Sequence, residues 1–165
     1  MSQDLDQALH RKVAELCERG DAHVEAGELA RALERYEEAL SLLPQPLYRW
    51  NAATWILTAM GETRFFLKDY RQARSTLEEA LRCPKGLGNP FIHLRLGQAA
   101  LELGDEDLAR DQLACAYQGA AEKIFAGEDP KYVALAREEA RTREAALAPQ
   151  SEGSPAGQGH KQGQG

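Results

Sequence analysis

The sequence predicts an all-α protein made of three stacked helical hairpins followed by a capping helix. Three observations predict this class. One spacing of small and large residues occurs three times along the chain, each copy has a turn signal in its middle, and the segment after the third copy begins with a helix-start signal and continues with an apolar stripe. Repetition of this kind indicates an array of similar helical units.

The repeated spacing is a glycine, an alanine twelve positions later, a large residue after four more, and a second alanine after another three. The positions are Gly20, Ala32, Tyr36 and Ala39, then Gly61, Ala73, Leu77 and Ala80, then Gly97, Ala109, Leu113 and Ala116. A glycine in one helix and an alanine in the next allow the two helices to pack closely. The large residue, one turn later, is expected to fill the space between repeats.

Turn and cap residues place the helix boundaries. Gly27 and Gly104 suit the left-handed conformation that ends a helix, and Asp69 and Asp105 suit the N-cap of the next one. Asp129, followed by a proline, marks the start of the last helix. We expect helices at about 3–26, 29–42, 50–67, 70–82, 90–103, 106–126 and 130–147.

The last two helices and the C-terminal segment complete the predicted domain. No proline stops the sixth helix, so we expect it to run to about residue 126, with Gly119 as a place where it could bend. The seventh helix carries an apolar stripe and is expected to cap the array, as a solenoid requires. Residues 1–147 then form one repeat domain. Residues 148–165 hold five Gly, four Gln and two Pro without a large apolar side chain, and are predicted to be disordered.

Composition excludes several function classes. The 165 residues carry a net charge of −6, which argues against nucleic acid as the main partner because phosphate binding needs a basic surface. No apolar run reaches the ~18 residues of a membrane span, and the acidic start lacks the features of a signal peptide. Cys17, Cys83 and Cys115 have no CxxC spacing, so neither a disulfide framework nor a zinc site is expected. A cytoplasmic location fits these features.

No residue pattern indicates an enzyme. The four histidines are scattered without HExxH spacing, and neither GxSxG nor a nucleotide-binding glycine loop is present. His93 takes the position that Leu16 and Leu57 hold in the other repeats. We interpret it as a hydrogen-bonded core histidine, with a special role as the alternative. We expect no catalytic residue, no cofactor and no metal.

The repeated pattern resembles the tetratricopeptide repeat (TPR) family, a helix-turn-helix unit of about 34 residues. The resemblance covers roughly residues 13–121. Equivalent positions lie 41 and then 36 residues apart, so extra residues fall in 44–50 and 83–90. In the first of these loops we expect one of Tyr48 and Trp50 to pack back and the other to be exposed. The resemblance implies a right-handed superhelix that binds proteins.

In TPR proteins the first helix of each repeat lines a concave binding face. The resemblance therefore implies these partner-binding residues: Asp21, Glu25, Trp55, Thr58, Glu62, Phe91, Arg95, Gln98 and Glu102. Trp55, Phe91 and Arg95 are expected at the centre of the contact, and the carboxylates are expected to steer a basic partner toward it.

Some TPR proteins hold the acidic C-terminal tail of heat-shock chaperones with a clamp of basic and asparagine side chains. The matching positions here are Cys17, Asp21, Ala59, Phe91 and Arg95. Only Arg95 suits that ligand, and Asp21 would repel a carboxylate. The face is therefore expected to bind a basic or neutral partner.

A second resemblance concerns residues 88–98, 116–132 and 52–55. These segments look like those of small bacterial repeat proteins encoded beside Rhs-type or other polymorphic toxins. The resemblance implies an immunity protein that binds a cognate toxin domain with a basic surface and occludes it. The alternative is an adaptor or chaperone that assembles a complex such as a secretion apparatus. The oligomeric state stays open.

Overall fold

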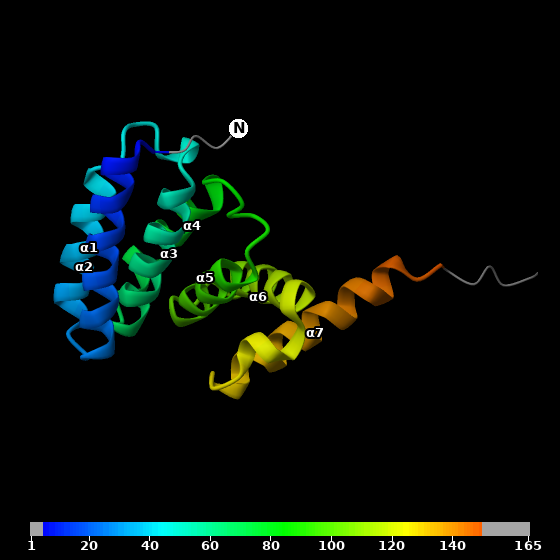
Figure 1. The fold of residues 1–165 in the computed structure, drawn as a ribbon. Helices are drawn as coiled ribbons and strands as arrows, with labels where there is room; N and C mark the ends of the chain where they lie inside the picture. Colours follow the sequence, from blue (N-terminus) through cyan, green and yellow to red (C-terminus); the bar gives the residue numbers. More distant parts are fainter. Residues whose placement is uncertain (1–4, 150–165) are drawn as a thin grey trace, which may run out of the picture.

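The computed structural model describes residues 5–149, which fold into seven α-helices and two short 3-10 helices (Figure 1). The helices are α1 (Gln7–Glu25), α2 (Leu29–Ser41), η1 (Leu47–Arg49), α3 (Asn51–Phe66), α4 (Tyr70–Arg82), α5 (Pro90–Glu102), α6 (Glu106–Ala120), η2 (Ala121–Phe125) and α7 (Pro130–Leu147). No strand occurs in this range. The predicted all-α class is confirmed, while most of the segment predicted to be disordered lies outside the described residues.

The helices pair in chain order. Helices α1 and α2, α3 and α4, and α5 and α6 form three hairpins, and contacts from α2 to α3 and from α4 to α5 stack the hairpins on one another. Helix α7 packs against α6, and its C-terminal part extends beyond the other helices (Figure 1). Each hairpin therefore contacts mainly its neighbours, as in a repeat array.

Glycine allows the two helices of each hairpin to approach closely. A Cβ atom built on Gly61 would lie 2.5 Å from Leu77 Cγ, and the equivalent distance from Gly97 to Leu113 Cγ is 2.7 Å. Both leucines are fully buried. The predicted close approach of the two helices is confirmed. One detail is corrected: each large residue packs on the glycine of its own hairpin, and so fills space within the hairpin as well as between repeats.

The three hairpins share one turn geometry. Gly27 and Gly104 end α1 and α5 in the left-handed region, with φ of 75° and 80°, and Lys68 takes the same place after α3 with φ of 61°. The Asp69 and Asp105 carboxylates then accept backbone N–H groups in the first turns of α4 and α6. Both aspartates cap helices as the sequence predicts.

The end of the sixth helix corrects the predicted boundary. Helix α6 stops at Ala120 instead of continuing to residue 126, because Ala121 adopts a positive φ of 54°. The chain then forms η2 and turns Phe125 into a buried cluster with Leu94 and Leu113. A straight helix would carry Phe125 past this cluster. The break therefore reflects burial of an aromatic side chain, which helical periodicity does not reveal.

The loop between the first two hairpins holds Trp50 inward and Tyr48 outward. Trp50 donates its indole N–H to the Pro44 carbonyl at 2.5 Å and packs on the core, whereas Tyr48 is 60% exposed. His93 is buried, with Nδ1 2.7 Å from Gln112 Oε1 and Nε2 2.9 Å from the Leu87 carbonyl. Both placements agree with the sequence analysis. Across residues 5–149, every helix is too short or too polar to cross a bilayer.

Candidate partner-binding face

The nine residues predicted to bind a partner all lie on α1, α3 and α5, the first helices of the three hairpins. The structure places most of them in three groups, with Glu62 shared by the first two and with Trp55 and Thr58 outside all three. One group lies between α1 and α3, a second joins α3 to α5, and a third joins α5 to α7. The groups differ in exposure: the first carries exposed side chains that a partner could contact, whereas the second is centred on buried side chains.

The first group lines a cavity of about 230 Å³ between α1 and α3. The lining residues are Asp21, Val24 and Glu25 from α1, Tyr36 from α2, and Ala59, Glu62, Thr63 and Phe66 from α3. We call this set the α1–α3 groove. It unites three of the predicted acidic residues with two exposed apolar side chains, Val24 and Phe66.

Burial and hydrogen bonding keep Tyr36, which lines the groove, and the nearby Cys17 uncharged at neutral pH. The Tyr36 hydroxyl donates to Asp21 Oδ1 at 2.6 Å. Burial, together with this hydrogen bond, raises the pKa of Tyr36, so its hydroxyl stays protonated and remains a donor. Burial and then the Asp21 charge raise the pKa of the neighbouring Cys17 to about 12. Cys17 is thus a neutral packing thiol at neutral pH rather than a nucleophile.

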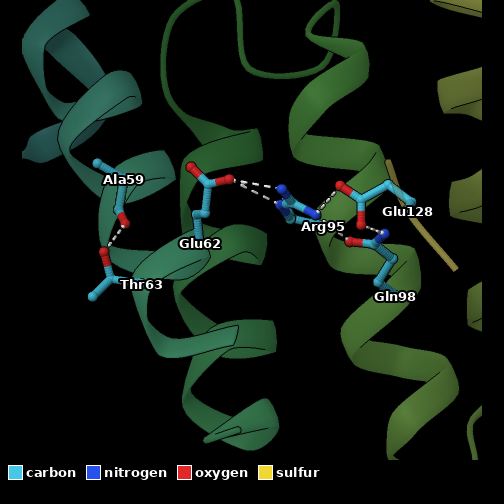
Figure 2. Close-up of polar contacts among 6 residues, drawn as sticks. All are labelled: Ala59, Glu62, Thr63, Arg95, Gln98 and Glu128. Atoms are coloured by element: carbon cyan, nitrogen blue, oxygen red, sulfur yellow. Dashed lines mark hydrogen bonds and ion pairs between the residues drawn. The ribbon is translucent and has the colours of Figure 1, made fainter. Parts of the chain in front are cut away.

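The second group centres on Arg95, which is only 5% exposed (Figure 2). Its Nε and Nη2 donate to Glu62 Oε1 at 3.1 and 2.8 Å, and its Nη1 donates to Glu128 Oε1 at 2.7 Å and Gln98 Oε1 at 2.8 Å. The fully buried Gln98 donates in turn to Glu128 Oε2 at 2.8 Å. Every nitrogen of the guanidinium is therefore engaged inside the protein.

Three phenyl rings surround the same guanidinium. Its carbon lies 5.0 Å from the Phe91 ring centroid, 5.1 Å from that of Phe66 and 5.6 Å from that of Phe65. Rings at this distance attract a cation electrostatically. Arg95 and Phe91 were predicted as central partner contacts, but the structure places Arg95 as an internal joint with Phe91 packed beside it. A buried cation requires partners of this kind, since an unpaired one would be strongly disfavoured.

Sequence reasoning missed Glu128, which supplies the second carboxylate for Arg95. It comes from the short segment between η2 and α7, outside the repeated spacing. The repeat pattern carries no signal for such a residue. Phe65, which lies three residues after Glu62, was missed as well.

The third group covers the far end of the face. Glu102 Oε1 accepts hydrogen bonds from Lys131 Nζ at 2.5 Å and from the Tyr132 hydroxyl at 2.6 Å. These bonds, with that from Lys131 the larger cause, lower the pKa of Glu102. The start of α7 therefore occupies this carboxylate, and the open part of the face lies toward α1 and α3.

The remaining predicted residues lie on α3. Trp55 is 44% exposed and precedes Glu62 by two helical turns, so it lies on the same side of the helix. The half-buried Thr58 donates its hydroxyl to the Thr54 carbonyl at 2.6 Å. Trp55 thus extends the exposed surface along α3. Among residues 5–149, no three acidic, histidine or cysteine side chains are grouped so as to hold a metal ion.

Solved structures share this arrangement of hairpins. The TPR domain of Arabidopsis OM64 matches with a TM-score of 0.63 at 17% identity, covering 81% of this chain and 98% of that domain. PcrH from Pseudomonas aeruginosa matches with a TM-score of 0.55 at 20% identity, covering 89% of this chain and 97% of its own. The chain has the tetratricopeptide repeat fold. At these identities the likeness concerns the TPR fold alone.

Curated sequences give a second comparison. The photosystem I assembly protein Ycf3 from two Synechococcus strains, one of them S. elongatus, is 39% identical over 88 residues in each case. The match covers 50% of this TPR chain and 49% of Ycf3, so the chain spans about half the length of the curated relatives it matches. No protein-family model matches the sequence.

Proposed function

We propose that this TPR chain is a non-catalytic module that binds a protein partner at the α1–α3 groove and the adjacent Trp55. One observation carries the proposal: the exposed apolar side chains Val24 and Phe66 line one groove with Asp21 and Glu25, which form no ion pair among residues 5–149. Exposed aromatic and aliphatic groups of this kind are typical anchors of protein interfaces. The rest of the face is occupied by the Arg95 pairs and by α7.

The charge of the groove favours a basic partner. The first TPR of Spaghetti (RPAP3), whose fold matches with a TM-score of 0.61, is bound to the HSP90 peptide SRMEEVD. In this chain the corresponding face presents Asp21, Glu25 and Glu62, and Arg95 is already neutralised by two carboxylates. An acidic peptide would be repelled here, whereas a basic segment would be attracted.

We infer that the general role is that of an assembly adaptor or chaperone in the cytoplasm. The names of similar proteins support this role: Ycf3 is a photosystem I assembly protein, and PcrH has been solved with the chaperone-binding region of PopB. A module of this kind holds a segment of its client in the groove while other contacts form. The client of this chain would be recognised by basic and apolar side chains.

The acidic groove favours a second candidate, an immunity protein. A toxin that acts on nucleic acid or nucleotides needs a basic substrate-binding surface, and an acidic TPR face could dock on that surface and occlude it. The two roles differ in stoichiometry and strength. An immunity protein forms a tight one-to-one complex, whereas an adaptor binds a short segment weakly or bridges two proteins.

Affinity capture from the native host with matched variants tests the proposal. The groove variant Trp55→Ala/Glu25→Lys should lose a partner that the parent chain retains. The control Tyr48→Ala/Glu79→Lys removes another exposed aromatic residue and reverses another exposed carboxylate away from the groove, and it should retain the partner. Loss with both variants, or with neither, would refute binding at this face.

The captured partner then decides between the two roles. Calorimetry and light scattering on the purified pair would measure affinity and stoichiometry. A one-to-one complex with a toxin domain, together with rescue of growth on co-expression, would establish immunity. A client bound through a short segment, or two proteins bridged at once, would establish the adaptor role.

A further inference from the structure

The cavity of the α1–α3 groove has the size of a side-chain pocket. Its volume of about 230 Å³ is below the roughly 300–1,000 Å³ of small-molecule sites. It opens on the face that carries the proposed function. A pocket of this size on a protein-binding surface accommodates one large side chain of the partner, which then acts as an anchor.

Part of the pocket lining is apolar. Val24 on α1 and Phe66 on α3 are 36% and 48% exposed, and Ala59 on α3 is half-buried. The Phe66 ring contacts Arg95 in the interior yet keeps about half of its surface in solvent. These apolar side chains can cover the methylene stem of a long side chain, which Lys and Arg bury along apolar surfaces.

The same lining also provides carboxylate oxygens that the fold leaves available. Within residues 5–149, the hydrogen bonds to Asp21 and Glu62 use Oδ1 and Oε1, and Glu25 takes part in no hydrogen bond or ion pair. Figure 2 shows the second oxygen of Glu62 directed away from Arg95. A carboxylate can accept several hydrogen bonds, so three acceptors with spare capacity line one small pocket. Of the residues that the structure describes, no basic one lines it.

We propose that this pocket binds a single lysine or arginine side chain of the partner protein. The stem lies on Val24, Ala59 and Phe66, and the cationic end donates hydrogen bonds to Asp21, Glu25 and Glu62. Such charge-assisted hydrogen bonds are the strong ones in a partly desolvated site. A neutral apolar side chain would leave the carboxylates unpaired, and an acidic one would be repelled. The inference rests on the proposed function and specifies its anchor.

Titration by NMR with a side-chain probe tests the anchor without knowing the partner. The probe is Nα-acetyl-lysine methylamide, and its uncharged analogue is Nα-acetyl-norleucine methylamide. In the full-length chain, the lysine probe should shift the backbone amide signals of the pocket residues and the norleucine probe should shift them much less. Asp21→Asn/Glu25→Gln should weaken the lysine effect about tenfold. The Asn side chain can still accept the hydrogen bond that the Tyr36 hydroxyl donates, so the variant should keep the fold.

Glu15→Gln is the matched control, because it removes an exposed carboxylate from another face of α1; it should leave the lysine titration unchanged. Three outcomes would overturn the proposal that the pocket binds a basic side chain. They are equal shifts with both probes, equal weakening by Glu15→Gln, and shifts spread over the acidic surface. Pocket signals that move with protein concentration alone would show that a second copy fills the groove, which also overturns it.

The two proposals fail separately. A captured partner that needs Trp55 but tolerates Asp21→Asn/Glu25→Gln would sustain the proposed function and refute the basic anchor. Conversely, the pocket could bind the lysine probe while the partner still binds the Trp55→Ala/Glu25→Lys variant. That result would sustain the anchor chemistry and refute the proposed binding face.

Discussion

At the scale of single residues, Arg95 joins three parts of the molecule. Its guanidinium pairs with Glu62 of the second hairpin and with Glu128 of the segment before α7, while its own helix belongs to the third hairpin. Three phenyl rings exclude water around it. One cation therefore links α3, α5 and the segment that leads into α7, and its partner Glu62 also lines the α1–α3 groove.

Replacing Arg95 with Ala should lower the free energy of unfolding by about 3 kcal/mol, because it leaves two carboxylates without a cation in a largely buried site. The value lies at the lower end for buried pairs since the side chains of Glu62 and Glu128 keep 31% and 20% exposure. Urea denaturation measures the loss. Arg71→Ala, at an exposed arginine, should change stability by less than about 0.5 kcal/mol. Equal losses of stability from the two substitutions would refute the stabilising role of Arg95 between these elements.

Glu102 should make stability depend on pH. Its pKa in the folded chain is lowered by the hydrogen bonds from Lys131 and Tyr132, so the ionised form is favoured by folding. The stabilisation is complete above the unfolded value of about 4.5 and is lost as the pH falls through the lower folded pKa. Urea denaturation of Glu102→Gln should thus show a deficit against the parent at pH 7 that disappears in acid. A deficit independent of pH would contradict this assignment.

At the scale of the elements, each hairpin is closed by a glycine that receives a large side chain. Tyr36 covers Gly20, Leu77 covers Gly61 and Leu113 covers Gly97. The contact repeats because the spacing repeats, and it brings the two helices of a hairpin closer than an alanine would permit. The small residue thus determines hairpin geometry in all three repeats.

Gly61→Ala should lower the free energy of unfolding by about 1–3 kcal/mol, since the new methyl group would lie 2.5 Å from Leu77 Cγ in a filled core. Thermal or urea unfolding measures the change. Gly88→Ala is the matched control: its nearest neighbour would be the Lys85 carbonyl oxygen at 3.9 Å. That variant should be neutral or more stable by up to about 1 kcal/mol. If Gly61→Ala left the free energy of unfolding unchanged, the contact between residue 61 and Leu77 would not be tightly packed.

At the scale of the whole molecule, α7 packs on one end of the array and leaves the α1–α3 groove at the other end open. Tyr132 and Ala136 of α7 complete the cluster that contains Phe125, and Lys131 forms an ion pair with Glu102. The α1–α3 groove receives no such cover from α7. The asymmetry directs a partner toward the first two hairpins.

A chain that ends at residue 129 should lose at least about 2 kcal/mol of stability, because the buried Tyr132 ring leaves the core and the cluster around Phe125 becomes exposed. Thermal unfolding and binding of a hydrophobic dye would report both effects. A chain that ends at residue 149 keeps α7 and should melt like the full-length protein. Equal melting of the two shortened chains would show that α7 does not act as a cap.

Much of the fold could be predicted because its determinants are local. The glycine spacing, the caps at Asp69 and Asp105 and the turn glycines act within one hairpin, so one stretch of sequence contains both partners of each contact. The helix end at Ala120 could not be predicted in this way. It depends on Phe125 finding a cluster formed by α5 and α6, and helical periodicity continues past the point where the chain turns.

The sequence by itself determined the all-α class and the three hairpins, since these follow from contacts between residues close along the chain. The tertiary structure alone decided which of the residues predicted to bind a partner remain available. Arg95 is enclosed because Glu62 and Glu128, each 33 residues away, reach it from other elements. Asp21 and Glu25 stay open because no basic side chain among residues 5–149 is folded against them. Burial and charge pairing depend on stacking between repeats, and stacking is not encoded in a local spacing.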